Sequence, residues 1–308
     1  MAAGAITAGW LADRIAGDPA RGHPVAAFGR LSDALEQHVW KPSRTVGALY
    51  ALSLIGTVAG GVAWIDRALV DRPRRRAVFR ALIIWTALGG RSLERAADAL
   101  AEAVDAGELE RARALAPTLV GRDPSDLDVA ELCRAAVESV AENTSDAVVA
   151  PLLWAALFGV PGAAGYRAAN TLDAMVGHRS ERYASFGWAA ARIDDVANWP
   201  AARLSALLAI AWAPALGGQR ADAWRAAFED GAGHPSPNAG RVEGAFAGAL
   251  SLTLGGVNSY RHGTEQRPTL GSGTPPAVGD IARAVRLARL VGASAAVLCA
   301  ALAWSVRR

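Results

Sequence analysis

The sequence lacks the short motifs that mark most nucleotide and metal sites. Its 308 residues contain no GxxxxGKS/T loop, no HExxH, no CxxC and no GxSxG, and no GxGxxG follows an expected strand. A bound nucleotide would therefore be held by something other than those loops. The only cysteines, Cys133 and Cys299, lie far apart in apolar helical patterns. This excludes a disulfide framework and a cysteine zinc site, and we expect two small buried side chains.

Charged residues are also scarce. They make up 20% of the chain and apolar residues 52%, with a mean hydropathy of +0.18, whereas soluble domains have about 25% charged residues. About 20 apolar residues span a bilayer. Two uncharged runs, Val46–Ile65 and Ala147–Gly165, are long enough, and Leu204–Gly218 and Leu290–Ser305 are borderline. We therefore expect an all-α, polytopic membrane helical bundle with roughly four or five spans, some distorted or re-entrant.

Arginine supplies nearly all of the positive charge, because Lys41 is the only lysine. The clearest cluster, DRPRRRAVFR at residues 71–80, follows the first apolar run. Basic residues beside a span stay in the cytoplasm, so we place this loop there. The cluster lacks the aromatic or helical support of a nucleic-acid site. The N-terminus has no basic region before a long apolar core and cleavage site, and we expect no signal peptide.

Residues 91–146 look soluble and form a helical insertion between the early and central spans. Apolar residues recur there at helical spacing, with a break at Asp105–Gly107. A turn at GRDPSDLD precedes the next helix, which either Asp126 or Asp128 caps. Residues 258–280 are rich in Gly, Pro and Thr, which predicts a loop. No linker is evident, so residues 1–308 are expected to form one integral-membrane domain.

Charged and amide side chains flank the central apolar run Ala147–Gly165 at both ends. Charged groups collected beside hydrocarbon usually mark a functional site. On the preceding helix, Glu138 and Glu142 lie four apart and repel each other. Arg134 can balance Glu138, but Glu142 and Asp146 have no nearby cation in the sequence. Either a magnesium ion or a structural cluster would satisfy these two carboxylates.

Polar positions also share helix faces after the run. They are Arg167, Asn170 and Asp173, then Asp194 with Asn198, and Arg192 with Asp195. Because Trp199–Pro200 follows, we expect the last helix to end near Asn198. Acid, amide and guanidinium groups together suit a magnesium-bound phosphate, and interhelical salt bridges are the alternative. Earlier in the chain, His23 either caps a helix or contacts an anion beside Arg21 and Arg30.

These residues fall within ordered blocks that cover nearly the whole chain. The blocks are GDPARGHPVAAFGRL, VGRDPSDLD, the segment from AAVESVAENTSDAVVAPLLW to NTLDAMVGH, RYASFGWAAARIDDVANWPAARLSALL, and SPNAGRVEGAFAGALSLTLGG. In this order they are far more specific than any single motif. The sequence resembles the adenosylcobinamide-phosphate synthases of cobalamin biosynthesis, the CobD/CbiB family. Thr144–Ser145 before Asp146 and His178 after Gly177 are small departures from the pattern.

The resemblance implies a multi-pass enzyme of the cytoplasmic membrane, a carbon-nitrogen ligase whose active site faces the cytoplasm. It joins the free propionate of adenosylcobyric acid to the amine of (R)-1-amino-2-propanol O-phosphate, giving adenosylcobinamide phosphate. ATP is the expected co-substrate and Mg²⁺ the expected metal. The expected partners are these two substrates and membrane lipid, not nucleic acid. A homo-oligomer, or a complex with other corrinoid-pathway membrane enzymes, is a further expectation.

On this hypothesis Glu142 and Asp194 are catalytic, with Asp194 the base for the attacking ammonium. The metal ligands are Glu142, Asp146, Asp173 and Asp195. The substrate- and phosphate-binding residues are His23, Arg167, Asn170, Arg182, Arg192, Asn198 and Asn238. An intramembrane magnesium-dependent prenyltransferase would instead show two well-formed Asp-rich motifs, of which only loose versions occur. A scaffold or transporter would carry polar residues inside its spans, whereas Ala147–Gly165 is uncharged.

Overall fold

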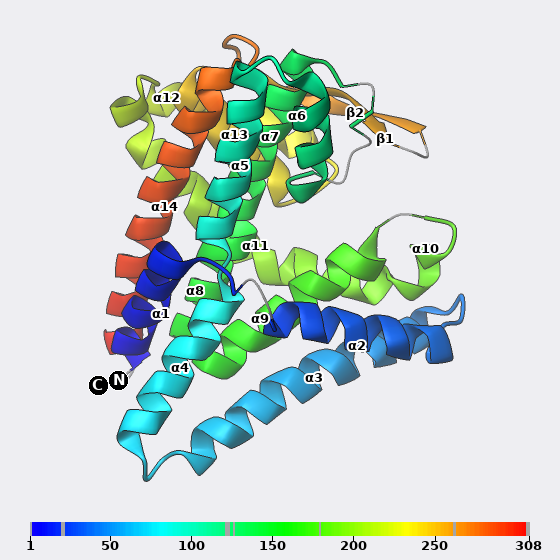
Figure 1. Cartoon of the computed structure of the whole chain (residues 1–308), viewed down its shortest axis with the longest axis vertical. Helices are drawn as coiled ribbons and strands as arrows, with labels where there is room; N and C mark the ends of the chain where they lie inside the picture. Colours follow the sequence, from blue (N-terminus) through cyan, green and yellow to red (C-terminus); the bar gives the residue numbers. More distant parts are fainter. Residues whose placement is uncertain are drawn as a thin grey trace. The chain divides into compact units, whose positions relative to one another are not determined.

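A computed structural model describes residues 2–19, 22–120, 124–125, 127–178, 180–260 and 263–305, with only the backbone described for 257–260 and 263–265. Arg21 and Asp126, named above, lie outside the described residues. The chain divides into two compact units, each assembled from segments distant in sequence (Figure 1). The first unit comprises Met1–Gly89, Asp146–Pro200 and Ala296–Arg308. The second comprises Gly90–Ser145 and Ala201–Ala295.

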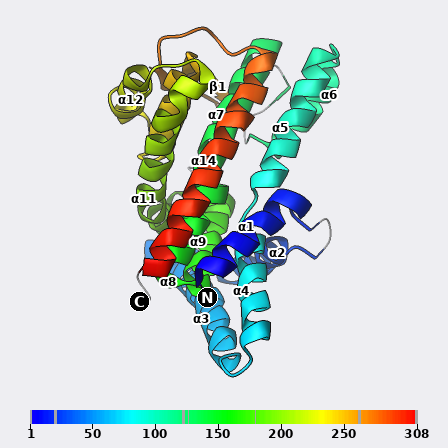
Figure 2. The same ribbon diagram turned by 90° about the vertical axis from the view of Figure 1, so that its left-hand side faces the viewer.

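The first unit is helical in its described part. Its elements are α1 (Ala2–Ala16), α2 (Pro24–Val39), α3 (Arg44–Ala68), α4 (Pro73–Ala87), most of the π-helical turn η2 (Ser145–Val149), α8 (Ala150–Phe158), α9 (Val160–Leu172), the π-helical turn η3 (Asp173–Gly177), α10 (Tyr183–Phe186), the first half of α11 (Trp188–Trp212) and the end of α14 (Val278–Ser305). Helix α1 packs on α4, and α9 packs on α3 and α8. Figure 2 shows α3 and α4 joined by a short turn.

Three helices among the described residues are long and apolar enough to cross a membrane. They are Arg44–Ala68, Trp188–Leu216 and Val278–Ser305. The expected all-α membrane fold is confirmed, with three helices of spanning length in place of the four or five spans expected. The borderline runs Leu204–Gly218 and Leu290–Ser305 are parts of the second and third of these helices.

The run Ala147–Gly165 is not one span. It is divided at Gly159, whose φ of +73° and ψ of −162° are accessible mainly to glycine. The resulting α8 and α9 have 9 and 13 residues, or about 14 and 20 Å, short of the roughly 30 Å hydrocarbon core. Helix α9 then packs closely on α8, since a Cβ at Gly162 would lie 2.5 Å from the carbonyl oxygen of Trp154. The expectation of re-entrant segments stays a prediction.

The expected helix end at Asn198 is also wrong, because α11 continues through Pro200 to Trp212. Proline lacks the N–H that would bond to the carbonyl of Val196, which weakens a helix locally without always ending it. The indole Nε1 of Trp154 donates to the next carbonyl, that of Ala197, at 3.0 Å. A side-chain donor therefore binds the backbone of α11 where the helical ladder is interrupted.

A hydrophobic core joins the elements around this part of the first unit. Tyr50 and Leu54 of α3 pack with Leu172, Val176 and Phe186. Helices α3 and α10 approach backbone to backbone, since a Cβ at position 47, a glycine, would lie 1.8 Å from the carbonyl oxygen of Phe186. This packing holds α9, α10 and α11 in a fixed relation along α3.

The second unit contains the expected insertion. Its elements are α5 (Gly90–Asp105), α6 (Leu109–Leu115), the 3-10 turn η1 (Ala116–Thr118), α7 (Val129–Thr144), the end of α11, the 3-10 turn η4 (Ala213–Leu216), α12 (Arg220–Phe228), the 3-10 turn η5 (Asp230–Gly233), α13 (Ala239–Leu250), β1 (Leu254–Tyr260), β2 (Gly263–Leu270) and most of α14. Asp128 caps α7 in a capping box with Glu131. Gly244 and Gly248 let α13 approach the backbone of α12. The loop expected at 258–280 instead includes parts of two antiparallel strands.

Candidate functional site

Asp194 lies in a hydrogen-bonded network inside the first unit. Its Oδ1 accepts from the side-chain amide of Asn170 at 3.3 Å, and its Oδ2 accepts from that of Asn198 at 2.9 Å. Asp194 and Asn198 lie one turn apart on α11, and Asn170 is on α9. Asp194 and Asn198 are 8% and 1% exposed. Because each carboxylate oxygen accepts from a different amide, the two asparagines hold Asp194 in one orientation.

Tyr166 of α9 extends the network to a third element. Its hydroxyl lies 2.7 Å from Oδ1 of Asn198 and 3.0 Å from the backbone carbonyl oxygen of Asp146. Burial, reinforced by the charges of Asp146 and Asp194, raises the pKa of Tyr166 well above its usual value. The phenol therefore stays protonated and acts as a donor at neutral pH. Because the Asp194 carboxylate only accepts, the Asn198 amide turns its nitrogen toward Asp194 and its oxygen toward the Tyr166 hydroxyl, which donates to it.

Arg167 is the cation of this network. Its Nη1 donates to Oδ1 of Asn170 at 3.3 Å, and its buried Nε makes no hydrogen bond with any described residue. Gly89 leaves space beside the guanidinium. A Cβ at Gly89 would lie 3.9 Å from Nη2 of Arg167 and 4.0 Å from Oδ2 of Asp18. The Gly89 N–H donates to the carbonyl oxygen of Ala147 at 3.0 Å, which fixes the backbone at this open position.

His23 lies near the same groups and is the N-cap of α2. Its Nδ1 accepts from the Val25 N–H at 3.2 Å, which requires an unprotonated Nδ1. Burial lowers the pKa of His23, partly offset by Asp18 and reinforced by Arg167, so the ring is neutral at pH 7. The ring proton is then on Nε2, 3.8 Å from Oδ1 of Asp18. Both alternatives for His23 are compatible with this geometry, because it caps a helix and still presents an N–H donor beside Arg167.

Two π-helical turns carry predicted acidic residues of the site. Asp146 lies in η2, directly before α8, and Asp173 begins η3, directly after α9. Such turns are rare and occur frequently at functional sites. The Asp173 carboxylate folds onto its own turn, since a Cβ at position 177, a glycine, would lie 1.8 Å from Oδ1 of Asp173.

The other predicted residues lie outside the network. Arg182 pairs with Glu36 at 2.8 Å and stacks on Trp40. Arg192 pairs with Asp195 at 3.0 Å on the exposed side of α11, whereas Asp194 of the same helix is buried. Glu142 and Asn238 belong to the second unit, where Asn238 accepts from Arg203 at 2.8 Å.

The described carboxylates do not form a ready-made metal cage. No group of three or more His, Cys, Asp or Glu side chains with metal-binding geometry occurs in the part of the chain that the structure describes. Magnesium, however, is often held by one or two carboxylates together with substrate phosphates. Asp146 fits that mode best among the predicted ligands, because its backbone carbonyl lies 3.0 Å from the Tyr166 hydroxyl in the network and Asp195 is engaged by Arg192.

A small apolar pocket adjoins Arg167. Its volume is about 200 Å³, below the roughly 300–1,000 Å³ of pockets for drug-sized ligands. Arg167 is the one charged side chain among its described lining residues. The others come from four helices: Pro24, Val25, Phe28, Val58, Val62, Ile83, Thr86, Ala87, Ala164, Ala168 and Thr171. A small molecule with an anionic group and a short apolar part matches this lining.

Sequence reasoning missed three residues of the site. Tyr166 lies directly beside Arg167 in the sequence, but the spacing argument assigned it no role. Asp18 entered only as part of the block GDPARGHPVAAFGRL, with no role of its own. Gly89 carries no side chain, and its role depends on the distances to Asp18 and Arg167. The signal for Asp18 was its place five residues before His23, in the same block.

Comparisons with known proteins agree with the ordered blocks. The family model for the CobD/Cbib protein matches residues 6–288. The chain is 50% identical over 304 residues to the cobalamin biosynthesis protein CobD of Mycobacterium tuberculosis, covering 98% of this chain and 96% of that protein. It is 43% identical to the protein of that name from Geobacter metallireducens, over 86% of this chain and 85% of that one. No solved structure matches. The chain therefore belongs to the CobD/CbiB family of cobalamin biosynthesis proteins.

Proposed function

We propose that this protein is an ATP-dependent ligase that joins adenosylcobyric acid to (R)-1-amino-2-propanol O-phosphate through an amide bond. One observation carries the proposal. The buried carboxylate of Asp194 is held by two amides, one of which is bound by a phenol and the other by a guanidinium, in a single network inside a helical membrane protein. Family membership supports a role in cobalamin biosynthesis and does not favour a prenyltransferase or a transporter.

The proposed reaction has two steps. A propionate oxygen of the corrinoid attacks the γ-phosphorus of ATP, which releases ADP and leaves an acyl phosphate. The amine then attacks the acyl carbon, and inorganic phosphate leaves with the former carboxylate oxygen. Phosphoryl transfer of this kind depends mainly on positioning and on neutralising charge. Magnesium would supply that neutralisation, and we assign Asp146 to it together with the substrate phosphates.

Each member of the network has a task in this proposal. Asp194 accepts the proton of the attacking ammonium, since it is the buried carboxylate that both amides hold in place. Asn170 and Asn198 orient that carboxylate, and Tyr166 fixes Asn198. Glu142, Asp173, Asp195, Arg182, Arg192 and Asn238 stay sequence-based predictions.

The amino alcohol phosphate is the substrate that we place beside Arg167. Its phosphate would receive N–H donors from Arg167 and from Nε2 of His23, two groups with buried N–H donors that bind no described acceptor. Its short carbon chain matches the apolar lining of the 200 Å³ pocket. A corrin ring is far larger than this pocket, so it would bind elsewhere. ATP is supplied from the cytoplasm, and we propose that the network opens toward that side.

The test is amide formation by purified protein with both substrates, ATP and magnesium, followed by mass spectrometry. Asp194→Asn should lower turnover at least about 100-fold, the usual contribution of a general base, while the protein stays folded. Glu94→Gln is the matched control, because Glu94 is also a buried carboxylate, 3% exposed, that pairs with arginines in the second unit. Near-normal turnover of Asp194→Asn would remove Asp194 from the mechanism.

A further inference from the structure

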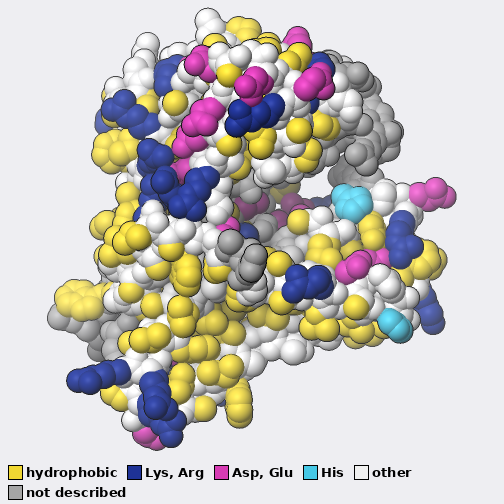
Figure 3. All heavy atoms as spheres, viewed as in Figure 1, with side chains coloured by type: hydrophobic (Ala, Val, Ile, Leu, Met, Phe, Trp, Pro, Cys, Tyr) yellow, Lys and Arg dark blue, Asp and Glu magenta, His cyan; other side chains and the backbone are white. Residues whose placement is uncertain are grey.

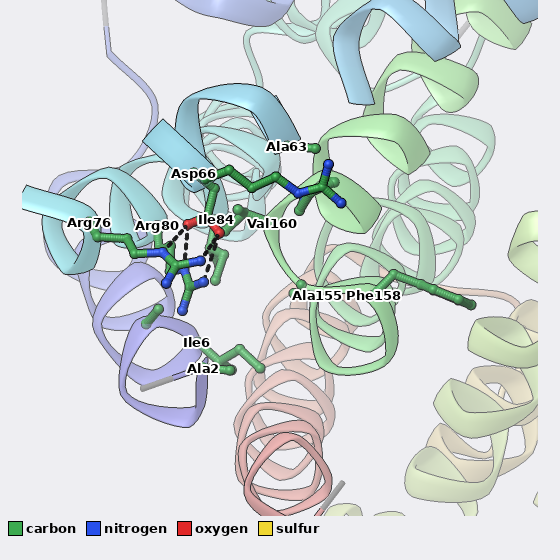
Figure 4. A pocket seen from close by; sticks show the side chains of 14 residues that line it. Ala2, Ile6, Ala63, Asp66, Arg76, Arg80, Ile84, Ala155, Phe158 and Val160 are labelled. Atoms are coloured by element: carbon green, nitrogen blue, oxygen red, sulfur yellow. Dashed lines mark hydrogen bonds and ion pairs between the residues drawn. The ribbon is translucent and has the colours of Figure 1, made fainter. Parts of the chain in front are cut away.

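A second polar site lies at the turn between α3 and α4, at the other end of α4 from Gly89. Asp66, in the last turn of α3, accepts from both Arg76 and Arg80 of α4 (Figure 4). Each guanidinium uses its Nε and one terminal nitrogen, at 2.6–3.1 Å. The four N–H groups fill the acceptor positions of the carboxylate. Asp66 therefore holds two guanidinium groups side by side.

The charge of this cluster is not balanced. One carboxylate faces two guanidinium groups, and Arg67 lines the same pocket, which leaves a net charge of +2 from the four side chains. Arg76 and Arg80 are only 19% and 11% exposed at their side chains. Each has five N–H groups, of which three bind no described residue. Like charges four residues apart on a helix repel each other, and a second anion would offset this.

The pocket beside these arginines has an apolar wall. Its volume is about 270 Å³, and it is lined by Ile6 of α1, Ala63 of α3, Ile84 of α4 and the α8–α9 turn around Gly159. A ligand that fits both walls therefore has an anionic group joined to an apolar body.

The position along α3 identifies the class of that ligand. The uncharged run Val46–Ile65 ends directly before Asp66 and Arg67, so the cluster begins where the hydrocarbon-facing segment stops. Trp64 is 72% exposed at this level, as expected for an indole side chain at a membrane interface. Figure 3 shows basic side chains at the α3–α4 turn and hydrophobic surface along α4 above it.

We propose that this pocket binds the phosphate headgroup of an anionic membrane phospholipid, with the outer N–H groups of Arg76 and Arg80 and the side chain of Arg67 as donors. The apolar wall receives the glycerol and the first part of an acyl chain. This site is separate from the proposed reaction, so its test does not depend on catalytic activity.

The experiment measures lipid binding to full-length, delipidated protein in detergent by native mass spectrometry and by thermal melting. The probes are a short-chain phosphatidylglycerol, a phosphatidylcholine of the same chain length and inorganic phosphate. Phosphatidylglycerol should bind and raise the melting temperature, and the other two should have little effect. Arg67→Gln should weaken phosphatidylglycerol binding roughly fivefold, the effect of one arginine near a lipid surface. Ala63→Phe, which fills the apolar wall without changing charge, should abolish the shift.

Arg74→Gln is the matched control, because Arg74 is an exposed arginine of the same turn that does not line the pocket. It should bind phosphatidylglycerol like the unsubstituted protein. Equal stabilisation by phosphatidylcholine would overturn the headgroup assignment, and equal stabilisation by inorganic phosphate would make this an anion site for soluble ligands. Unchanged binding in Arg67→Gln and Ala63→Phe, or an equal loss in Arg74→Gln, would overturn the pocket itself.

Discussion

Replacing Tyr166 with phenylalanine removes one hydroxyl group and leaves the ring in place. Oδ1 of Asn198, in a side chain that is 1% exposed, then loses its 2.7 Å donor. The amide cannot turn over to compensate, because its oxygen would then face Oδ2 of Asp194, where its nitrogen now donates at 2.9 Å. A buried acceptor left without a donor costs about 1–3 kcal/mol.

That cost should appear in catalysis if Asn198 aligns Asp194. If this whole free energy of about 1–3 kcal/mol is lost from transition-state stabilisation, turnover falls roughly 5- to 160-fold, since about 1.4 kcal/mol corresponds to tenfold. The assay is kcat for amide formation with both substrates saturating, alongside thermal melting in detergent. The expected result is a large fall in kcat in a protein that still melts cooperatively.

Tyr50→Phe is the matched control for this substitution. Tyr50 also lies in the first unit, is 4% exposed, and donates its hydroxyl proton to the backbone carbonyl of Ser32 at 2.9 Å. Both variants lose one buried hydrogen bond, so their melting temperatures should fall by similar amounts. Only Tyr166→Phe should lose turnover. Equal turnover in the two variants would refute the claim that the network orients a reacting group.

Further predictions concern the surroundings of the network and the orientation of α3 in the membrane. Gly89→Leu should abolish turnover by filling the space beside Arg167, whereas Gly60→Leu, at a glycine with no atom within 4 Å of its added Cβ, should not. His23→Asn keeps a helix-capping oxygen but removes the Nε2 donor, so KM for the amino alcohol phosphate should rise. Burial lowers the pKa of His23 in the folded protein, so as the pH falls below about 6.5 the unfolded chain binds a proton at this position before the folded protein does. The free energy of unfolding should therefore fall with pH in this range, and it should fall more in the unsubstituted protein than in His23→Asn. Arg74→Cys should react with a membrane-impermeant maleimide only from the cytoplasmic side. The two native cysteines should give little background, because both are buried as expected. Reaction from the outer side would show that α3 has the opposite orientation in the membrane. Helix α4 is about 22 Å long, short of the roughly 30 Å hydrocarbon core, so a cytoplasmic α3–α4 turn is compatible with a network that opens to the cytoplasm.

Hydrophobic length predicted the membrane class of the fold but not its details. Val46–Ile65 became α3 because an uncharged run of that length has few alternatives. Ala147–Gly165 has similar composition, but Gly159 adopts a positive φ and divides it. Pro200 does not end α11, which continues past a side-chain donor on another helix. Both outcomes depend on tertiary contacts that helical periodicity does not contain.

Side-chain spacing predicted the members of the site better than their roles. Asp194 and Asn198 do share a face of α11 and hydrogen bond to each other. Arg192 and Asp195 share another face and pair on the exposed side. Spacing could not distinguish these faces, because it does not say which one meets Tyr166 and Asn170. The role of Gly89 could not be predicted at all, since it consists of space beside two distant charged groups.

The most direct test of the proposed ligase follows one oxygen atom. Adenosylcobyric acid labelled with ¹⁸O in its free propionate is incubated with the purified protein, ATP, magnesium and aminopropanol phosphate, and the phosphate released is analysed by mass spectrometry. We expect one ¹⁸O atom in each inorganic phosphate, with one ADP formed for each amide. Amide formation with no label in the phosphate, or no amide in the presence of ATP, would contradict it.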